Sequence, residues 1–338
     1  MTFERRGELN LDRRPYRVTR ETFETLGRYW SDAACRLHWP HPFLLPDWIQ
    51  SWWRVFGGDT EILLCGVRDR DQLLGIAPLL REGHSARFIG NTEIFDYSDF
   101  IVRPGGEDAF AHALIRHLRS RGILRLELHG LRPDSTVLTA FRPVAHSLGG
   151  ECRIEQEDVT VELRLPDTWE AYLHRLTAKQ RHEVRRKFRR LYEGGRIQFK
   201  LWDPAHHIDD AIDTFMRLFN SNRRDKADFM TEEMSAYFRD LMQALARIGL
   251  LKLFVLAIDD VTAAAVMCCD YHNRRYLYNN AYDDRYRRFN VGLLSKVLSI
   301  RDGINAGIHV YDFLRGDEVY KIRLGGRPTP IYKCSVEL

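Results

Sequence analysis

The sequence predicts a mixed α/β protein in which one order of strands and helices occurs twice. Strand-like runs alternate with helix-like stretches along the whole chain. Each half contains a strand, two helices and three strands, followed by a helix, a strand and a terminal strand. No repeat of residues accompanies this order. The pattern therefore indicates a duplicated architecture rather than a duplicated sequence.

The composition is that of a folded protein large enough for two domains. The chain has 338 residues, of which 44% are hydrophobic and 12% aromatic, enough apolar surface for two cores. Lys and Arg number 51 and Asp and Glu 47, which leaves a net charge of +4. Any preference for anionic partners must therefore come from local patches.

Cysteine usage and hydropathy predict a cytoplasmic protein. The six cysteines contain no C-x-x-C pair, which disfavours zinc sites and disulfide frameworks and suits a reducing compartment. We predict no metal site. The charged N-terminus lacks an apolar core, and no run of about 18 apolar residues occurs, so no membrane span is expected.

In the first half, strands are predicted from alternating or short apolar runs and helices from apolar residues three or four positions apart. Pro46 or Asp47 would cap the second helix. Residues 1–12 are expected to be a loose tail. Strands are expected at 16–20, 61–68, 72–81, 86–89, 97–102, 123–129 and 152–163, and helices at 21–37, 47–56, 107–121 and 135–147.

In the second half, one long helix is predicted to connect the two domains and to end at Gly194 and Gly195. The boundary is expected near Pro166, which predicts an N-terminal domain at 1–165 and a C-terminal domain at 166–338. Helices are expected at 169–192, 206–220, 232–248 and 293–306, and strands at 196–202, 251–258, 262–272, 275–282, 308–314 and 330–336.

The loop before the helix at 293–306 is the most informative stretch. It brings Arg287, Arg288, Asn290 and Gly292 to a helix N-terminus, where free N–H groups and the helix dipole favour a phosphate. Gly292 would let the backbone approach closely. The alternative is a basic loop that binds nothing, because a single glycine flanked by arginines is a weak pattern.

Several motifs together resemble the CelD-like acetyltransferase family of the GNAT superfamily, over about residues 15–325. The C-terminal part contains Asn290-Val291-Gly292-Leu293 and then YDFLRGDEVYK, which supplies Tyr311, Asp312, Phe313, Leu314, Gly316, Glu318, Tyr320 and Lys321. The N-terminal part contains FLLPDWIQSWWRVFGG, the run Gly75-Ile76-Ala77-Pro78-Leu79, and FDYSDFIV. The GNAT phosphate-loop pattern is matched only in part, by Arg287, Asn290 and Gly292.

This resemblance implies two tandem GNAT-like domains, with an acyl-CoA bound by the second and the acceptor on the side of the first. The implied activity is transfer of an acyl group from acetyl-CoA or another acyl-CoA to an amine. The acceptor would be a small molecule or saccharide, such as an amino sugar or a polysaccharide or cell-envelope precursor. Cofactor-binding residues would be Tyr278, Asn279, Arg287, Arg288, Asn290, Val291, Gly292 and Leu293.

Asp312 and Glu318 are the carboxylates predicted to take part in proton transfer, since an amine must lose a proton during acyl transfer. Their alternative role is to bind backbone N–H groups. Lys321 is grouped with them, either as a partner of one carboxylate or as a site for an acidic substrate group. The residues predicted to bind substrate are Asp96, Tyr97, Asp99 and Arg181, the last because Thr177-x-x-x-Arg181 resembles a family pattern.

Two other functions stay open. Tandem GNAT architecture also occurs in Fem-type transferases, which take an aminoacyl group from a charged tRNA, and the basic stretch KQRHEVRRKFRR at 179–190 would suit that donor. For most of these basic residues we favour a solvated helix face. The third possibility is a catalytically degenerate GNAT fold that binds an envelope precursor or a protein partner.

Overall fold

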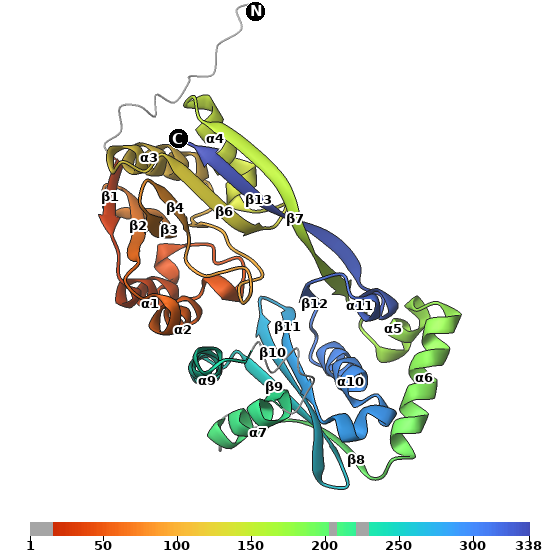
Figure 1. The fold of residues 1–338 in the computed structure, drawn as a ribbon. Coiled ribbons are helices and arrows are strands. Elements are labelled where there is room, and N and C mark those ends of the chain that lie inside the picture. The colour runs from red at the N-terminus through yellow and green to blue at the C-terminus, as the bar shows by residue number, and fades with distance from the viewer. Residues whose placement is uncertain (1–15, 203–207, 221–229) are drawn as a thin grey trace, which may run out of the picture.

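The protein forms one continuous mixed sheet covered by helices (Figure 1). The computed structural model describes residues 16–202, 208–220 and 230–338. Within them the sheet order is β1-β2-β3-β4-β6-β13-β7-β12-β11-β10-β9-β8, and β5 pairs with β3. The strands are β1 (Tyr16–Arg20), β2 (Glu61–Asp69), β3 (Gln72–Glu82), β4 (Ser85–Phe88), β5 (Ile101–Val102), β6 (Arg125–Leu131), β7 (Glu151–Arg164), β8 (Ile197–Leu201), β9 (Leu251–Ile258), β10 (Val261–Tyr271), β11 (Arg274–Tyr282), β12 (Val310–Arg315) and β13 (Arg327–Glu337).

The helices surround three hydrophobic cores. One core lies between the two halves of the molecule, where α2 packs against α9, and the others lie under α3 and α4 and under α10. The helices are α1 (Phe23–Ser31), α2 (Pro46–Phe56), α3 (Glu107–Ser120), α4 (Arg142–Ser147), α5 (Trp169–Arg175), α6 (Ala178–Tyr192), α7 (Ile208–Asn220), α9 (Glu232–Arg247), α10 (Val291–Asn305) and α11 (Val319–Arg323), with the 3₁₀ helix η5 (Asp284–Phe289) before α10.

The two halves share one arrangement, which confirms the predicted mixed α/β fold. Strands β2, β3 and β4 form an antiparallel meander, α3 follows, and β6 then lies parallel to β4. Strands β9, β10 and β11 form a second meander, α10 follows, and β12 lies parallel to β11. A helix crossover is what a parallel pair of strands requires.

The terminal strand of each half pairs with the other half. Strand β7 lies antiparallel to β12, and β13 lies antiparallel to β6. The two strands also pair with each other, from Arg327 opposite Glu162 to Glu337 opposite Glu151. The predicted division at residues 165 and 166 stays a prediction, and three adjacent strand pairs, β6–β13, β13–β7 and β7–β12, join residues from its two sides.

Several predicted elements differ from those observed. The helix at 21–37 ends at Ser31, because the Asp32 side chain accepts the N–H of Ala34 and starts a separate 3₁₀ turn. The helix at 169–192 is two helices, since Thr177 starts α6 with a capping box that includes Gln180. The strand at 97–102 is reduced to β5, and α11 was not predicted. Residues 206 and 207 of a predicted helix lie outside the described part of the chain.

Candidate active site

A cleft opens where β11 and β12 separate. These parallel strands pair only from Arg274 opposite Val310 to Tyr276 opposite Asp312. Beyond this point a cavity of about 500 Å³ lies between them. Residues of both strands, of α10 and α11, and of the segment 92–96 line it: Thr92, Glu93, Ile94, Asp96, Phe238, Leu277, Tyr278, Asn279, Asn280, Lys296, Phe313, Leu314, Arg315, Gly316, Glu318, Tyr320 and Lys321.

Irregular pairing in both strands coincides with this separation. Cys268 lies opposite Leu277 and Met267 opposite Asn279, so Tyr278 is an extra residue in β11. Asp312 of β12 lies opposite Glu162 of β7, and Arg315 lies opposite Thr160. Between these pairs β12 has two residues where β7 has one, so β12 also contains one extra residue. A bulge of this kind bends its strand and re-aims the side chains around it.

The floor of the cleft contains a strained backbone at Leu314. This residue has φ of 60°, a left-handed conformation that costs a branched side chain on the order of 1–3 kcal/mol. Its N–H donates to Asp312 Oδ1 at 2.9 Å, and its carbonyl oxygen accepts from Lys321 Nζ at 3.2 Å. Side chains on both sides therefore hold the strained turn in place.

Lys321 is buried and bound entirely by protein groups. Its ammonium donates to the carbonyl oxygens of Leu314, Arg315 and Gly316 and forms an ion pair with Glu318 Oε2 at 2.8 Å. The predicted pairing with one of the two carboxylates is therefore with Glu318. These contacts give Lys321 a structural task, and a catalytic role for it stays a prediction.

The carboxylates Asp96, Asp312 and Glu318 differ in environment. Glu318 is 57% exposed at the rim. Asp96 lines the cavity, accepts the N–H of Arg315 at 2.8 Å, and has its pKa raised by burial. Asp312 lies behind the cavity wall, where it accepts from the Tyr97 hydroxyl. Asp96 and Glu318 can therefore reach a ligand in the cleft, whereas Asp312 supports the wall.

Asp312 belongs to a buried network at the seam between the halves. Arg274 Nη1 lies 3.1 Å from Asp312 Oδ2 and 2.9 Å from Glu162 Oε1, and Arg132 also contacts Glu162. Burial raises the pKa of Asp312 to about 6, although Arg274 opposes the shift. The network joins β7, β11 and β12 to Arg132, the residue directly after β6.

The start of α10 is uncapped but partly covered. Asn290 has φ of 58° and no side-chain hydrogen bond caps the helix. Arg287 and Arg288 are exposed, whereas Val291 and Gly292 are buried. A Cβ at position 292 would lie 2.6 Å from the Tyr282 ring, so glycine is needed here for packing against that ring.

The first turn of α10 carries no acidic residue, which suits an anion at a helix N-terminus. Lys187 of α6 lies 3.3 Å from Asn290 Oδ1 and adds a positive charge. Residues 287–293 do not line the cavity themselves, but Lys296, one turn further along α10, does.

The predicted substrate-binding residues fall into different places. Asp96 lines the cleft, whereas Tyr97 and Asp99 line a separate pocket of about 170 Å³ at the seam. Asp99 accepts the N–H groups of Phe100, Thr136 and Val137, and burial raises its pKa to about 7. Arg181 donates to the carbonyl oxygens of Leu173 and Leu176 at the junction of α5 and α6. The structure thus does not bring these four residues together.

The two strand residues predicted to bind the cofactor, Tyr278 and Asn279, both line the cavity. The Tyr278 ring also packs near Trp48 in the core between the halves, and its hydroxyl donates to the Ile94 carbonyl at 3.1 Å. This contact ties the segment 92–96 to β11.

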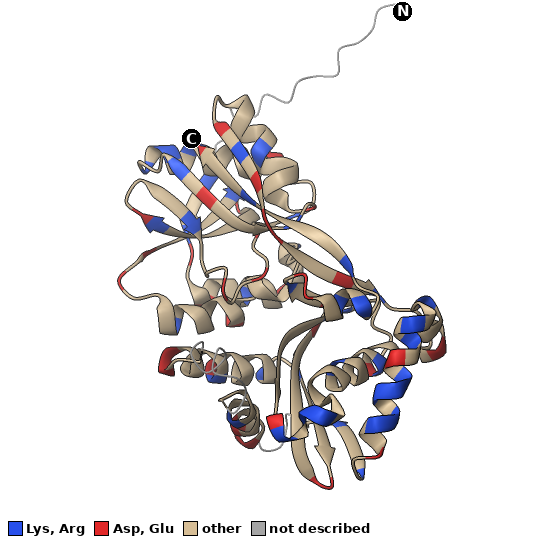
Figure 2. Ribbon diagram, turned by 45° about the vertical axis from the view of Figure 1, so that its right-hand side comes forward, with Lys and Arg blue, Asp and Glu red and all other residues tan. Residues whose placement is uncertain are grey.

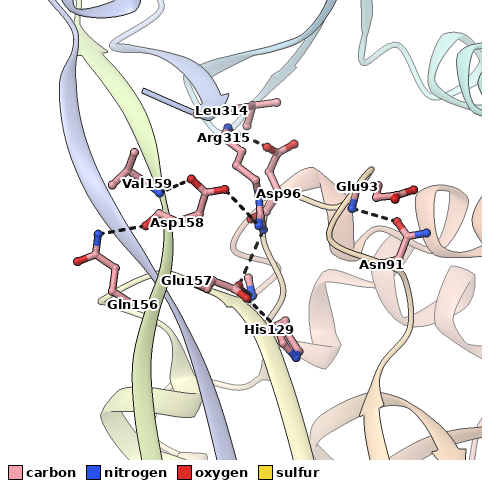
Figure 3. Close-up of polar contacts among 12 residues, drawn as sticks. Asn91, Glu93, Asp96, His129, Gln156, Glu157, Asp158, Val159, Leu314 and Arg315 are labelled. Carbon is pink, nitrogen blue, oxygen red and sulfur yellow. Dashed lines mark hydrogen bonds and ion pairs between the residues drawn. The ribbon is translucent and has the colours of Figure 1, made fainter. Parts of the chain in front are cut away.

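Lys296 and Arg315 also line the cleft and were not predicted. Lys296 is the one cation in the apolar run VGLLSKVLSI, a signal that could have identified it. Arg315 occurs within the family-like motif, but its place in the cleft depends on the bulge in β12. Figure 3 shows Arg315 between Asp96 and the β7 residues Glu157 and Asp158.

Comparisons with known proteins agree with this architecture. Residues 178–322 match a family model described as an acetyltransferase (GNAT) domain. FemX is similar in structure, with a TM-score of 0.61 and 11% identity over 94% of this chain and 96% of that one. No curated protein matches the sequence.

Two further solved structures share the fold. A tandem GNAT protein from the clavulanic acid biosynthesis pathway has a TM-score of 0.50 and 13% identity, over 95% of this chain and 98% of that one. The C-terminal domain of a putative lysylphosphatidylglycerol synthetase from Agrobacterium fabrum has a TM-score of 0.58 and 11% identity, over 86% of each chain. The chain therefore has a tandem GNAT acyltransferase fold, and the narrower CelD-like resemblance stays a prediction.

No helix among residues 16–202, 208–220 and 230–338 is long and apolar enough to cross a membrane.

Replacing Lys321 by Met should lower the free energy of unfolding by about 3 kcal/mol, because three carbonyl oxygens, one buried and two partly buried, lose their donor. Urea denaturation would measure the change. Arg323→Met is the matched control, since Arg323 is exposed two residues further along and its loss should cost under about 0.5 kcal/mol. Equal stabilities of the two variants would contradict the anchoring role.

Replacing Asp312 by Asn should change the pH dependence of stability. A folded pKa of about 6 exceeds the value of about 3.9 for an unfolded Asp, so the native state binds the proton more tightly. Wild-type stability should fall from pH 4 to pH 7, with a contribution from Asp312 of about 2 kcal/mol. Denaturation curves across this range should lack that contribution in Asp312→Asn. An unchanged slope would show that Asp312 does not titrate there.

Proposed function

We propose that the protein is an N-acyltransferase that moves an acyl group from an acyl-CoA to an amine. The main observation in support of this function is the separation of β11 from β12, because β11 loses its parallel partner beyond Tyr276. Its unpaired backbone groups can bind the amides of a pantetheine arm. The uncapped start of α10, with Arg287 and Arg288 beside it, suits the diphosphate.

Acyl-CoA would supply the activated thioester carbon. The cleft would hold this carbon beside the amine, so that positioning provides much of the rate enhancement. As the nitrogen attacks, the C–N bond forms, the C–S bond breaks and the sulfur leaves as a thiolate. Asp96 would accept the proton lost by the nitrogen, since it lines the cavity and its raised pKa makes it a better base than an ordinary carboxylate.

Glu318 also lines the cleft and is exposed at its rim. A carboxylate at the rim attracts a cationic amine, which would release one proton to solvent before its nitrogen attacks. The acceptor would be a small molecule or saccharide amine, as the family resemblance implies.

A second candidate function is transfer of an aminoacyl group from a charged tRNA. The observation that favours it is the basic outer face of α6, which is visible in Figure 2. Lys179, Arg185, Arg186, Arg189 and Arg190 are exposed on this helix, and Lys187 reaches the loop before α10. A polyanion could follow this face to the cleft.

Replacing Arg287 and Arg288 together by Ala should raise the KM for acetyl-CoA about tenfold and change kcat little, because the lost contacts bind the donor equally before and during reaction. Steady-state kinetics with thiol release as the readout would measure both constants. Arg285→Ala is the control, since Arg285 is equally exposed but pairs with Asp283.

Unchanged kinetics in the double variant would contradict the phosphate site. Activity with an aminoacyl-tRNA but with no coenzyme A ester would favour the second candidate function.

Replacing Asp96 by Asn should lower kcat by about 10²–10³, because the amide cannot accept a proton. In the wild type kcat should fall as pH is lowered through the raised pKa of Asp96, since the protonated carboxyl is no longer a base. The pH profile of kcat would test this. A variant with wild-type kcat and an unchanged profile would exclude Asp96 as the base.

A further inference from the structure

The first half contains a cleft equivalent to the proposed acyl-CoA cleft. Strands β4 and β6 are parallel and pair only from Ser85 opposite Arg125 to Arg87 opposite Glu127. Past this point a cavity of about 230 Å³ lies at the strand ends. Helix α3 lies between these strands in the chain, as α10 does between β11 and β12. The same structural device therefore occurs twice.

The N-terminus of α3, the helix between β4 and β6 in the chain, does not suit a phosphate. Glu107 and Asp108 occupy the first turn of α3, where their charges repel an anion at the positive end of the helix. The equivalent turn of α10 has no acidic residue. A nucleotide is therefore the wrong ligand for the first-half cavity.

The residues that line this cavity are both apolar and polar. The apolar ones are Phe88, Ile89 and Phe95, and all three are buried. The charged and titratable ones are Arg87 of β4 and Glu127 and His129 of β6. Such a cavity suits a small organic body with one polar end.

The two cavities adjoin. Thr92 lines both of them, and Glu93 and Asp96, a few residues further along the same segment, line the acyl-CoA cleft. A ligand with its body in the first-half cavity could therefore extend one end past Thr92 towards these two carboxylates.

A network between the cavities leaves the charge of Asp96 available (Figure 3). His129 Nδ1 lies 2.7 Å from Glu157 Oε2, and the Arg315 guanidinium lies 4.0 Å from Glu157 and 3.6 Å from Asp158. Arg315 thus has its own acidic partners on β7. Within the described residues Asp96 has no ion pair. Its carboxylate accepts the backbone N–H of Arg315. The Arg315 guanidinium makes only a long contact, to the backbone carbonyl oxygen of Asp96.

We propose that the first-half cavity is the acceptor site, and that it takes a primary amine with an apolar body. The body packs against Phe88, Ile89 and Phe95, and the amine passes Thr92 to meet Asp96 at the thioester. Carboxylates at that end attract a cationic amine and disfavour an acid. This inference rests on the proposed function, since it places the acceptor relative to the acyl-CoA cleft.

Binding can be tested on the whole protein by NMR of isoleucine δ1-methyl groups. The probes are 2-phenylethylamine and its neutral isostere 2-phenylethanol. The amine should shift the Ile89 methyl signal in a saturable way and leave Ile212 of α7 unchanged. The alcohol should bind about tenfold more weakly, because it lacks the charge. Absence of an Ile89 shift, or equal affinities for both probes, would overturn the proposal.

A pocket-filling variant gives a second test. His129→Trp places an indole in the cavity and should weaken 2-phenylethylamine binding about tenfold or more. His146→Trp is the matched control, because His146 is exposed on α4, and it should bind as the wild type does. Wild-type affinity in His129→Trp would overturn the proposed site. If that variant does not fold, the titration of the wild-type Ile89 signal still tests whether the amine binds in this cavity.

Acetyl-CoA, added separately, distinguishes the two proposals. It should shift Ile94, which lines the acyl-CoA cleft, and leave Ile89 in place. If the amine shifts the Ile89 signal and acetyl-CoA shifts no signal, the proposed amine site stands and the proposed acyl-CoA donor is wrong. If acetyl-CoA shifts Ile94 and the amine shifts no signal, the donor stands and the amine site is wrong.

Discussion

The antiparallel pairing of β7 with β13 is the interaction on which the rest of the structure depends. Each strand ends one half of the chain and pairs with the other half, so the sheet is continuous only because these two strands lie side by side. The same exchange carries Glu157, Asp158 and Glu162 of β7 to the seam. It gives Arg315 its acidic partners and gives Arg274 a second partner besides Asp312, and a cation that is largely removed from water needs such partners.

The separation of two parallel strands is the second constraint, and it occurs once in each half. A crossover helix joins strands that pair over three residues and then diverge, which leaves a cavity at their ends. The cavities differ because the helices differ: α3 begins with two acids and α10 with none. One architecture thus offers two sites with opposite electrostatic preferences, and Thr92 lies where they meet.

Some residues of the predicted site line the cleft, some maintain its shape, and Lys321 does both. Asp96, Tyr278, Asn279, Glu318 and Lys321 line it. Asp312 and Lys321 bind the backbone of the left-handed Leu314. A strained residue persists only where its surroundings hold it. Residues of a family-like motif, such as Asp312 and Lys321, can therefore maintain the shape of a site as well as contribute to its chemistry.

The order of elements could be read from the sequence, because apolar spacing and turn residues act over a few positions. The glycines after α6, the loop before α10 and the two meanders were found in this way. The break at Thr177 was missed although its capping box is local. What only the tertiary structure decided is long-range: the exchange of β7 and β13, the side of β11 that Tyr278 faces, and the separation of Asp96 from Tyr97 and Asp99. These depend on which strands pair and in which register, and a shift of one residue, as at the bulges in β11 and β12, changes the face on which a side chain lies.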